Sequence, residues 1–84
     1  MNESEIRTRV VGVIRSIAPE VEEGELRDDR PLRDQVDLDS MDWLNVLVAV
    51  HEKLRVDIPE ADYRKLVTLN DIVAYIGAKL ASRV

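Results

Sequence analysis

Apolar residues recur at helical spacing near the start of the chain. They follow one another at steps of three and four, which places them on one face of a helix: Ile6, Val10, Val13, Ile14 and Ile17. Pro19 ends this helix because the residue before a proline disfavours helical backbone angles. The pattern therefore predicts a first helix that buries one apolar stripe.

The next segment, from Pro19 to about Leu38, shows no sustained period and contains Gly24 and Pro31. We predict a long connection held to the core by scattered apolar side chains: Leu26, Leu32, Val36 and Leu38. A connection of this length in a small domain usually has a functional or topological reason.

Helical spacing returns from Ser40 to about Leu54, where Asp39 is placed to cap the first turn with its carboxylate. A short helix follows, with Pro59 in its first turn, and runs to about Leu66.

A last helix begins after Thr68, with Asp71 three residues on as in a capping box. Its apolar stripe comprises Leu69, Ile72, Val73, Ile76 and Leu80. There is no β-alternation. The pattern predicts an all-α fold for residues 1–84, a single domain built as a small four-helix bundle with three longer helices, one short helix and a long first loop.

Composition narrows the function. The 84 residues contain no cysteine, so any thiol chemistry must be imported, and the net charge of −5 argues against a nucleic-acid partner. No apolar run is long enough for a membrane span, and the N-terminus lacks the pattern of a signal peptide. We expect a monomeric cytoplasmic protein, too short to enclose a catalytic pocket.

Ser40 is the first candidate for function, because it lies in the first turn of a predicted helix, between Asp39 and Asp42. A phosphate attached there would face the free N–H groups and the positive dipole end of the helix. The alternative is structural, since Asp-Ser is common at helix starts for capping alone.

The stretch Asp37-Leu38-Asp39-Ser40-Met41-Asp42, followed by an apolar helix and by Val56-Asp57-Ile58-Pro59-Glu60, resembles the acyl carrier protein family around its modified serine. The resemblance covers essentially the whole chain. It implies that a phosphopantetheinyl transferase attaches 4'-phosphopantetheine to Ser40, beside Asp39. It also implies a carrier without catalytic activity, which presents acyl thioesters to partner enzymes of fatty-acid, lipid or polyketide-type biosynthesis.

The chain departs from the family pattern at two positions of the motif. Asp37 stands where many members have glycine, and Met41 stands where leucine usually follows the serine. The helix after Ser40 is also less acidic than in carriers of fatty-acid synthesis. We therefore expect a specialised member rather than the housekeeping carrier.

A helical wheel of residues 40–55, at about 100° per residue, predicts two apolar faces. The first would face the core: Trp43, Val46, Leu47, Val50 and Leu54. The second, Met41, Leu44 and Val48, lies beside Ser40 and is interpreted as a docking surface, the alternative being that the first loop covers it. Asp37, Asp39 and Asp42 would steer basic partner surfaces toward it, although the many acids of this region are equally explained as a solvated loop.

In the family, an acyl chain can tuck between the second and third helices. The residues that match this lining are Trp43, Val50, Ile58, Tyr63 and Leu66. Trp43 and Tyr63 are larger than the family's usual residues, so we expect shelter for short or medium chains, unless Trp43 swings aside. The alternative is that the helices sit further apart.

Other interpretations are weaker. Asp37 and Asp39 resemble the start of a calcium loop, but Met41 occupies the next ligand position, and no metal site is predicted. A triad of Ser40, His51 and an aspartate would need a cleft that the chain is too short to suggest. Two alternatives stay open: a peptidyl or aryl carrier of a non-ribosomal assembly line, and an unmodified helical interaction module.

Overall fold

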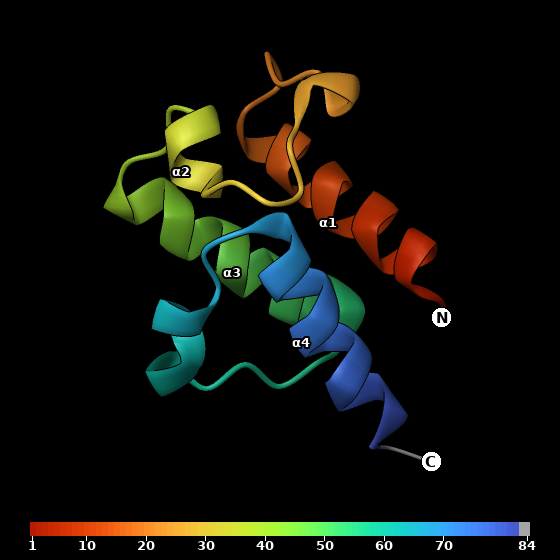
Figure 1. Ribbon diagram of the computed structural model, residues 1–84. Coiled ribbons are helices and arrows are strands. Elements are labelled where there is room, and N and C mark those ends of the chain that lie inside the picture. The colour runs from red at the N-terminus through yellow and green to blue at the C-terminus, as the bar shows by residue number, and fades with distance from the viewer. Residues whose placement is uncertain (83–84) are drawn as a thin grey trace.

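Three long helices make the body of the structure, a computed structural model that describes residues 1–82 (Figure 1). They are α1 (Glu3–Ile17), α3 (Ser40–Leu54) and α4 (Leu69–Ala81). The segments between them contain short helical turns: η1 (Glu23–Glu25), α2 (Leu32–Gln35) and η2 (Glu60–Lys65). No strand occurs in residues 1–82, and none of their helices is long and apolar enough to cross a membrane. The predicted all-α bundle is confirmed.

Side chains at the helix starts satisfy the free backbone N–H groups there. The Asn2 side chain accepts a hydrogen bond from the Glu5 N–H at 2.8 Å at the start of α1. At the start of α4, the Thr68 hydroxyl accepts from the Asp71 N–H, and the Asp71 carboxylate accepts from the Thr68 N–H, both at 3.0 Å. This reciprocal pair is the predicted capping box.

The core lies where α1 packs against both α3 and α4. The predicted stripes are buried in it, except that Ile17 and Leu80 are half-buried at the ends of their helices. In α1 the side chains of Ile6, Val10 and Ile14 have at most 1% of their surface exposed. Burial of each such side chain contributes about 1.5–3 kcal/mol, so this contact is the main source of stability.

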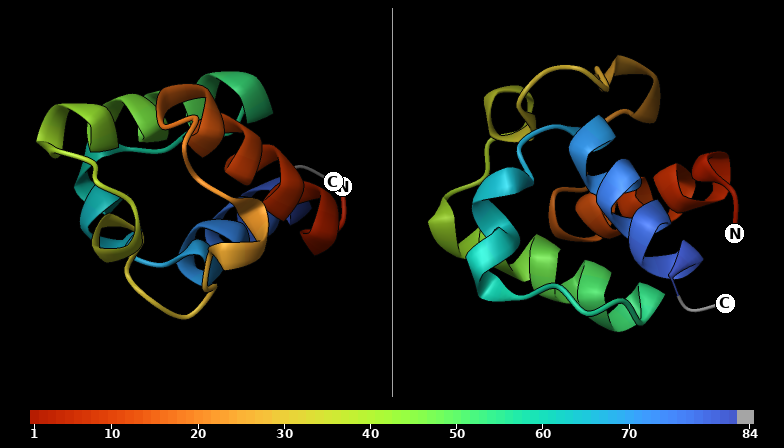
Figure 2. Two further views of the ribbon diagram at one scale, coloured as in Figure 1. Left: turned by 90° about the horizontal axis from the view of Figure 1, so that it is seen from above. Right: turned by 60° about the horizontal axis from the view of Figure 1, so that its bottom comes forward.

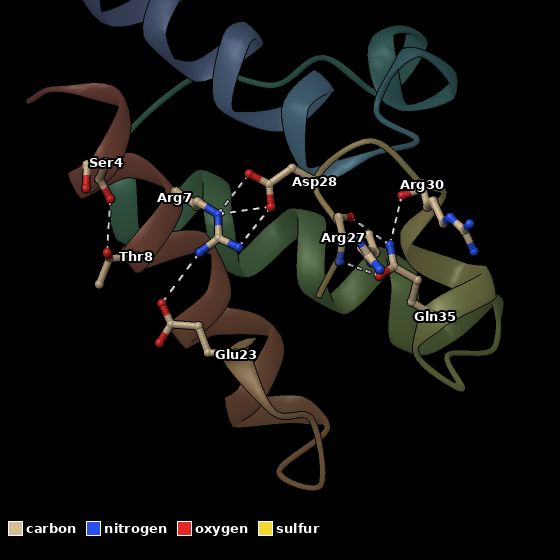
Figure 3. Close-up of polar contacts among 8 residues, drawn as sticks. All are labelled: Ser4, Arg7, Thr8, Glu23, Arg27, Asp28, Arg30 and Gln35. Atoms are coloured by element: carbon tan, nitrogen blue, oxygen red, sulfur yellow. Dashed lines mark hydrogen bonds and ion pairs between the residues drawn. The ribbon is translucent and has the colours of Figure 1, made fainter. Parts of the chain in front are cut away.

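The connection between α1 and α3 is more ordered than an irregular loop, because it contains η1 and α2. Its four predicted anchors, Leu26, Leu32, Val36 and Leu38, are all buried. Arg7 of α1 holds it in place further: its Nε donates to both carboxylate oxygens of Asp28 at 3.1 Å, and its Nη1 lies 3.5 Å from Glu23 Oε1 (Figure 3). The hydrogen bond with Asp28 raises the pKa of Arg7.

The second half of the connection is held by hydrogen bonds to backbone N–H and carbonyl groups. The Gln35 side chain accepts from the Arg27 N–H at 2.6 Å and donates to the carbonyls of Arg27 and Arg30 (Figure 3). The Leu32 N–H donates to the Val67 carbonyl at 2.9 Å, which fixes α2 beside the entry to α4. The end of the connection therefore approaches α3 from a fixed position.

The predicted short helix is a 3-10 helix, η2, and Pro59 precedes it as the N-cap instead of lying in its first turn. Its bonds span three residues, as from the Asp62 N–H to the Pro59 carbonyl at 2.9 Å. None of its side chains is fully buried. This segment therefore lacks the continuous apolar stripe that would favour an α-helix.

The capping box of α4 yields a stability prediction. Thr68→Ala removes the hydroxyl that accepts from the Asp71 N–H, and such a loss costs about 1 kcal/mol. We expect the thermal midpoint to fall by about 4–8 °C, as measured by circular dichroism. The matched control is Thr8→Ala, because the Thr8 hydroxyl only bonds back to the Ser4 carbonyl on an exposed face. Equal effects of the two substitutions would contradict the capping role.

Candidate functional site

Ser40 is the first residue of α3 and is exposed at the end of this helix that lies next to α2 (Figure 1). Asp39 holds the helix start, since its carboxylate accepts from the Asp42 N–H at 2.8 Å and its carbonyl accepts from the Trp43 N–H at 2.9 Å. Within residues 1–82 the Ser40 hydroxyl makes no hydrogen bond. The Ser40 hydroxyl is therefore accessible, whereas the side chain of the preceding residue, Asp39, caps the helix.

The start of α3 suits a covalently attached phosphate. The backbone N–H groups of Ser40 and Met41 have no acceptor within the described part of the chain, and they lie at the positive end of the helix dipole. A phosphate on Ser40 would sit next to these donors. Asp39 acts in the structure as the cap, and its contact with a cofactor stays a prediction.

The two apolar faces of α3 are present as predicted. Trp43, Val46, Leu47, Val50 and Leu54 are buried. The second face, here termed the exposed row, is open to solvent: Met41 is 67% exposed, Leu44 40% and Val48 43%. The alternative that the first connection covers this face is therefore wrong. The exposed row starts one residue after Ser40, and its use for docking stays a prediction.

A hollow of about 290 Å³ is lined by residues from the first turn of α3 and from η2. The ribbon in Figure 2 shows η2 near the start of α3. We term this hollow the α3–η2 hollow, and its lining comprises Pro31, Arg33, Trp43, Tyr63, Arg64, Leu66 and Val67. Three of the five predicted lining residues line it, namely Trp43, Tyr63 and Leu66. Val50 and Ile58 are buried in the core and do not line it.

Sequence reasoning missed the two arginines of this hollow. Arg33 comes from α2 and Arg64 from η2, thirty-one positions later in the chain. Each has the pattern of an ordinary exposed charge, and only the tertiary fold brings both to the lining of one hollow. A second hollow, of about 360 Å³, is lined by residues between Glu20 and Gln35 and does not include Ser40.

One side-chain hydrogen bond joins η2 to α4. The Tyr75 hydroxyl donates to Asp62 Oδ2 at 2.6 Å, and the Lys65 amine lies 3.5 Å from the other carboxylate oxygen. The Lys79 amine lies 5.4 Å from the centre of the Tyr75 ring. Burial, with the hydrogen bond to Asp62, raises the pKa of Tyr75 to about 12. The same hydrogen bond lowers the pKa of Asp62.

The acids near Ser40 do not form a metal site. Asp37 is exposed and Asp42 half-buried, and no group of three or more possible ligands occurs in the described part of the chain. His51 lies at the other end of α3, where its Nδ1 is 2.7 Å from the Val56 carbonyl. Ser40 and His51 are three turns apart, so the triad hypothesis has no geometry to support it.

Comparison with known proteins places this site in context. Residues 8–76 match the family model described as phosphopantetheine attachment site. The chain is 31% identical to an acyl carrier protein of Thermosynechococcus vestitus, over 98% of this chain and all of that protein. It is 30% identical to an acyl carrier protein of Acidothermus cellulolyticus, over 92% of this chain and 90% of that protein.

The bond between Tyr75 and Asp62 yields a prediction at high pH. The pKa of Tyr75 is about 12 in the folded state and 10.0 for the free side chain, so the Tyr75 hydroxyl keeps its proton to a higher pH in the folded state than in the unfolded state. Its contribution to stability is therefore present below pH 10 and is lost as the pH rises from about 10 to 12. We expect Tyr75→Phe to reduce the fall in the free energy of unfolding over this range, as measured by urea titration.

The matched control is Tyr63→Phe, because the Tyr63 hydroxyl makes no hydrogen bond within residues 1–82. This variant should keep the wild-type dependence on pH. An unchanged dependence in Tyr75→Phe would contradict the coupling.

Proposed function

Because the chain belongs to the acyl carrier family, whose members have a phosphopantetheine attachment site, we propose that Ser40 is the residue that carries the arm. As a member of this family the protein is a carrier and not a catalyst. The observation that carries the proposal is the exposed, unbonded hydroxyl of Ser40 at the start of α3.

The other serines are less suitable. Ser4 and Ser82 lie outside the residues that match the family, and the Ser82 hydroxyl donates to the Lys79 carbonyl at 2.8 Å. Ser16 lies inside α1, where its hydroxyl donates to the Val13 carbonyl at 2.6 Å. Ser40 alone combines the family match, an accessible hydroxyl and a helix start that favours a phosphate.

Thioester formation needs a thiol, which the side chains of this protein do not provide. The chain contains no cysteine, and the arm supplies a terminal thiol that holds an acyl group as a thioester. Ser40 would hold the arm through a phosphodiester, and the free N–H groups of Ser40 and Met41 at the start of α3 would stabilise its negative charge. Tethering raises the effective concentration of the acyl group at each partner enzyme that docks the carrier.

The exposed row and the acids around Ser40 support a docking role. Met41, Leu44 and Val48 would give a partner an apolar contact, and Asp37 and Asp42 would steer basic surfaces toward it. Partners would be the phosphopantetheinyl transferase and acyl-handling enzymes of fatty-acid, lipid or polyketide-type biosynthesis. We place the protein in the cytoplasm as a monomeric single domain.

The size of the α3–η2 hollow supports a small cargo. Its volume of about 290 Å³ lies just below the usual range of ligand pockets, about 300–1,000 Å³. Trp43 and Tyr63 occupy two of its walls, so a short or medium acyl chain fits better than a long one. The same two aromatic side chains favour an aryl carrier of an assembly line as the second candidate function.

Attachment at Ser40 is tested by mass. The apo protein is incubated with a phosphopantetheinyl transferase and coenzyme A, and intact-mass spectrometry then follows the addition of one arm. Ser40→Ala should fold normally and stay unmodified, because it lacks the acceptor oxygen. Ser16→Ala is the control and should be modified like the wild type. An arm on Ser40→Ala would reject the assignment, and an unmodified wild type would favour an interaction module.

Electrostatic steering is tested with charge-neutral substitutions. We expect Asp37→Asn and Asp42→Asn together to slow modification by the transferase several-fold at low salt, with a smaller effect at high salt because ions screen exposed charges. Asp39 is left unchanged because it caps α3. The control Asp29→Asn removes an exposed charge from the first connection. Rates that follow total charge, whichever acid is replaced, would exclude local steering.

A further inference from the structure

The α3–η2 hollow combines two kinds of lining that do not serve the same ligand. Trp43, Tyr63 and Leu66 offer apolar surface, as a hydrocarbon chain requires. Arg33 of α2 and Arg64 of η2 line the same hollow, and no acidic side chain is among its lining residues. A purely alkyl cargo would gain nothing from two guanidinium groups.

The two arginines are unusual in their charge environment. Both are exposed, and like charges at one hollow repel each other. Neither has an ion pair or hydrogen bond through its side chain within residues 1–82. Asp62, a neighbouring acid of η2, is engaged by Tyr75 and Lys65 instead. An anion between the arginines would offset their repulsion.

The hollow is also within reach of the proposed attachment site. Trp43 follows Ser40 by three residues, and side chains at this spacing are neighbours on a helix surface. An acyl group on an arm at Ser40 can therefore fold back past Trp43 into the hollow. Its free end would then meet Arg33 and Arg64.

From this lining we infer that the preferred cargo is a short acyl group whose free end is a carboxylate, the half-thioester of a dicarboxylic acid. Arg33 and Arg64 hold the carboxylate, while Trp43 and Tyr63 flank the carbon chain. Guanidinium groups suit this role because their planar N–H donors match a carboxylate. The inference rests on the proposed function, since it requires a loaded arm on Ser40.

The test compares two acyl groups of equal carbon number. The transferase loads the apo protein from succinyl-coenzyme A or from butyryl-coenzyme A, so that the cargoes differ only in a terminal carboxylate or methyl group. We expect the succinyl form to melt about 2–5 °C higher than the butyryl form, as for a partly exposed ion pair in a small domain. Its Arg33 and Arg64 Nε–H resonances should shift in NMR spectra.

Variants assign the effect to the two arginines. Arg33→Gln and Arg64→Gln should each reduce the difference in melting temperature between the two loaded forms, and the double variant should abolish it. Arg9→Gln, which removes an exposed arginine from α1, should leave the difference unchanged. High salt should also reduce the difference in the wild type.

Three results would overturn the inference. The first is equal melting of the succinyl and butyryl forms, and the second is a difference that survives in the double variant. The third is that the arm without an acyl group shifts the Arg33 and Arg64 resonances as much as the succinyl form does. The anion at the arginines would then be the phosphate of the arm. Failure of the proposed function looks different, because intact mass would then show no arm on Ser40 of the wild type.

Discussion

The burial of one face of α3 against α1 determines how Ser40, the exposed row and Trp43 are presented. Val46, Leu47 and Val50 are completely buried, so the helix cannot rotate about its axis without exposing them. Successive residues turn by about 100°, and this fixed rotation directs Met41 and Leu44 outward. It also directs Trp43 toward η2. The same packing that stabilises the bundle thus presents Ser40 and the exposed row together.

The position of α3 along its axis depends on the connection that precedes it. Arg7 binds Asp28 through two nitrogen atoms, and this geometry favours a defined contact over the loose ion pairs common on surfaces. The side chains of Arg7 and Asp28 are partly exposed, so their ion pair orders the connection more than it adds to the free energy of unfolding. Together with the bond from Leu32 to Val67, the pair holds a long segment in one path to Ser40.

Local sequence patterns predicted the three long helices, the caps of α3 and α4, and both apolar faces of α3. Such patterns depend on neighbours three and four residues apart, and Thr68 with Asp71 forms the predicted box for that reason. The turns η1 and α2 were not predicted, because they are ordered by contacts with residues outside them: Glu23 of η1 with Arg7, and Gln35 of α2 with Arg27. The motif predicted Ser40 at the start of α3, where the structure has it, and its role as the attachment site stays a prediction. Arg33 and Arg64 could not be paired from sequence, since only tertiary packing brings them together.

The 3-10 geometry of η2 bears on how the molecule fluctuates. Its short backbone bonds have poorer alignment than those of an α-helix, and none of its side chains is fully buried. Regions with few buried contacts open locally at a small fraction of the global unfolding free energy. Amide protons of η2 should thus exchange with solvent far sooner than those of α1. The wall of the hollow formed by η2 can consequently open locally while the three long helices remain folded, and a tethered group could enter and leave without global unfolding.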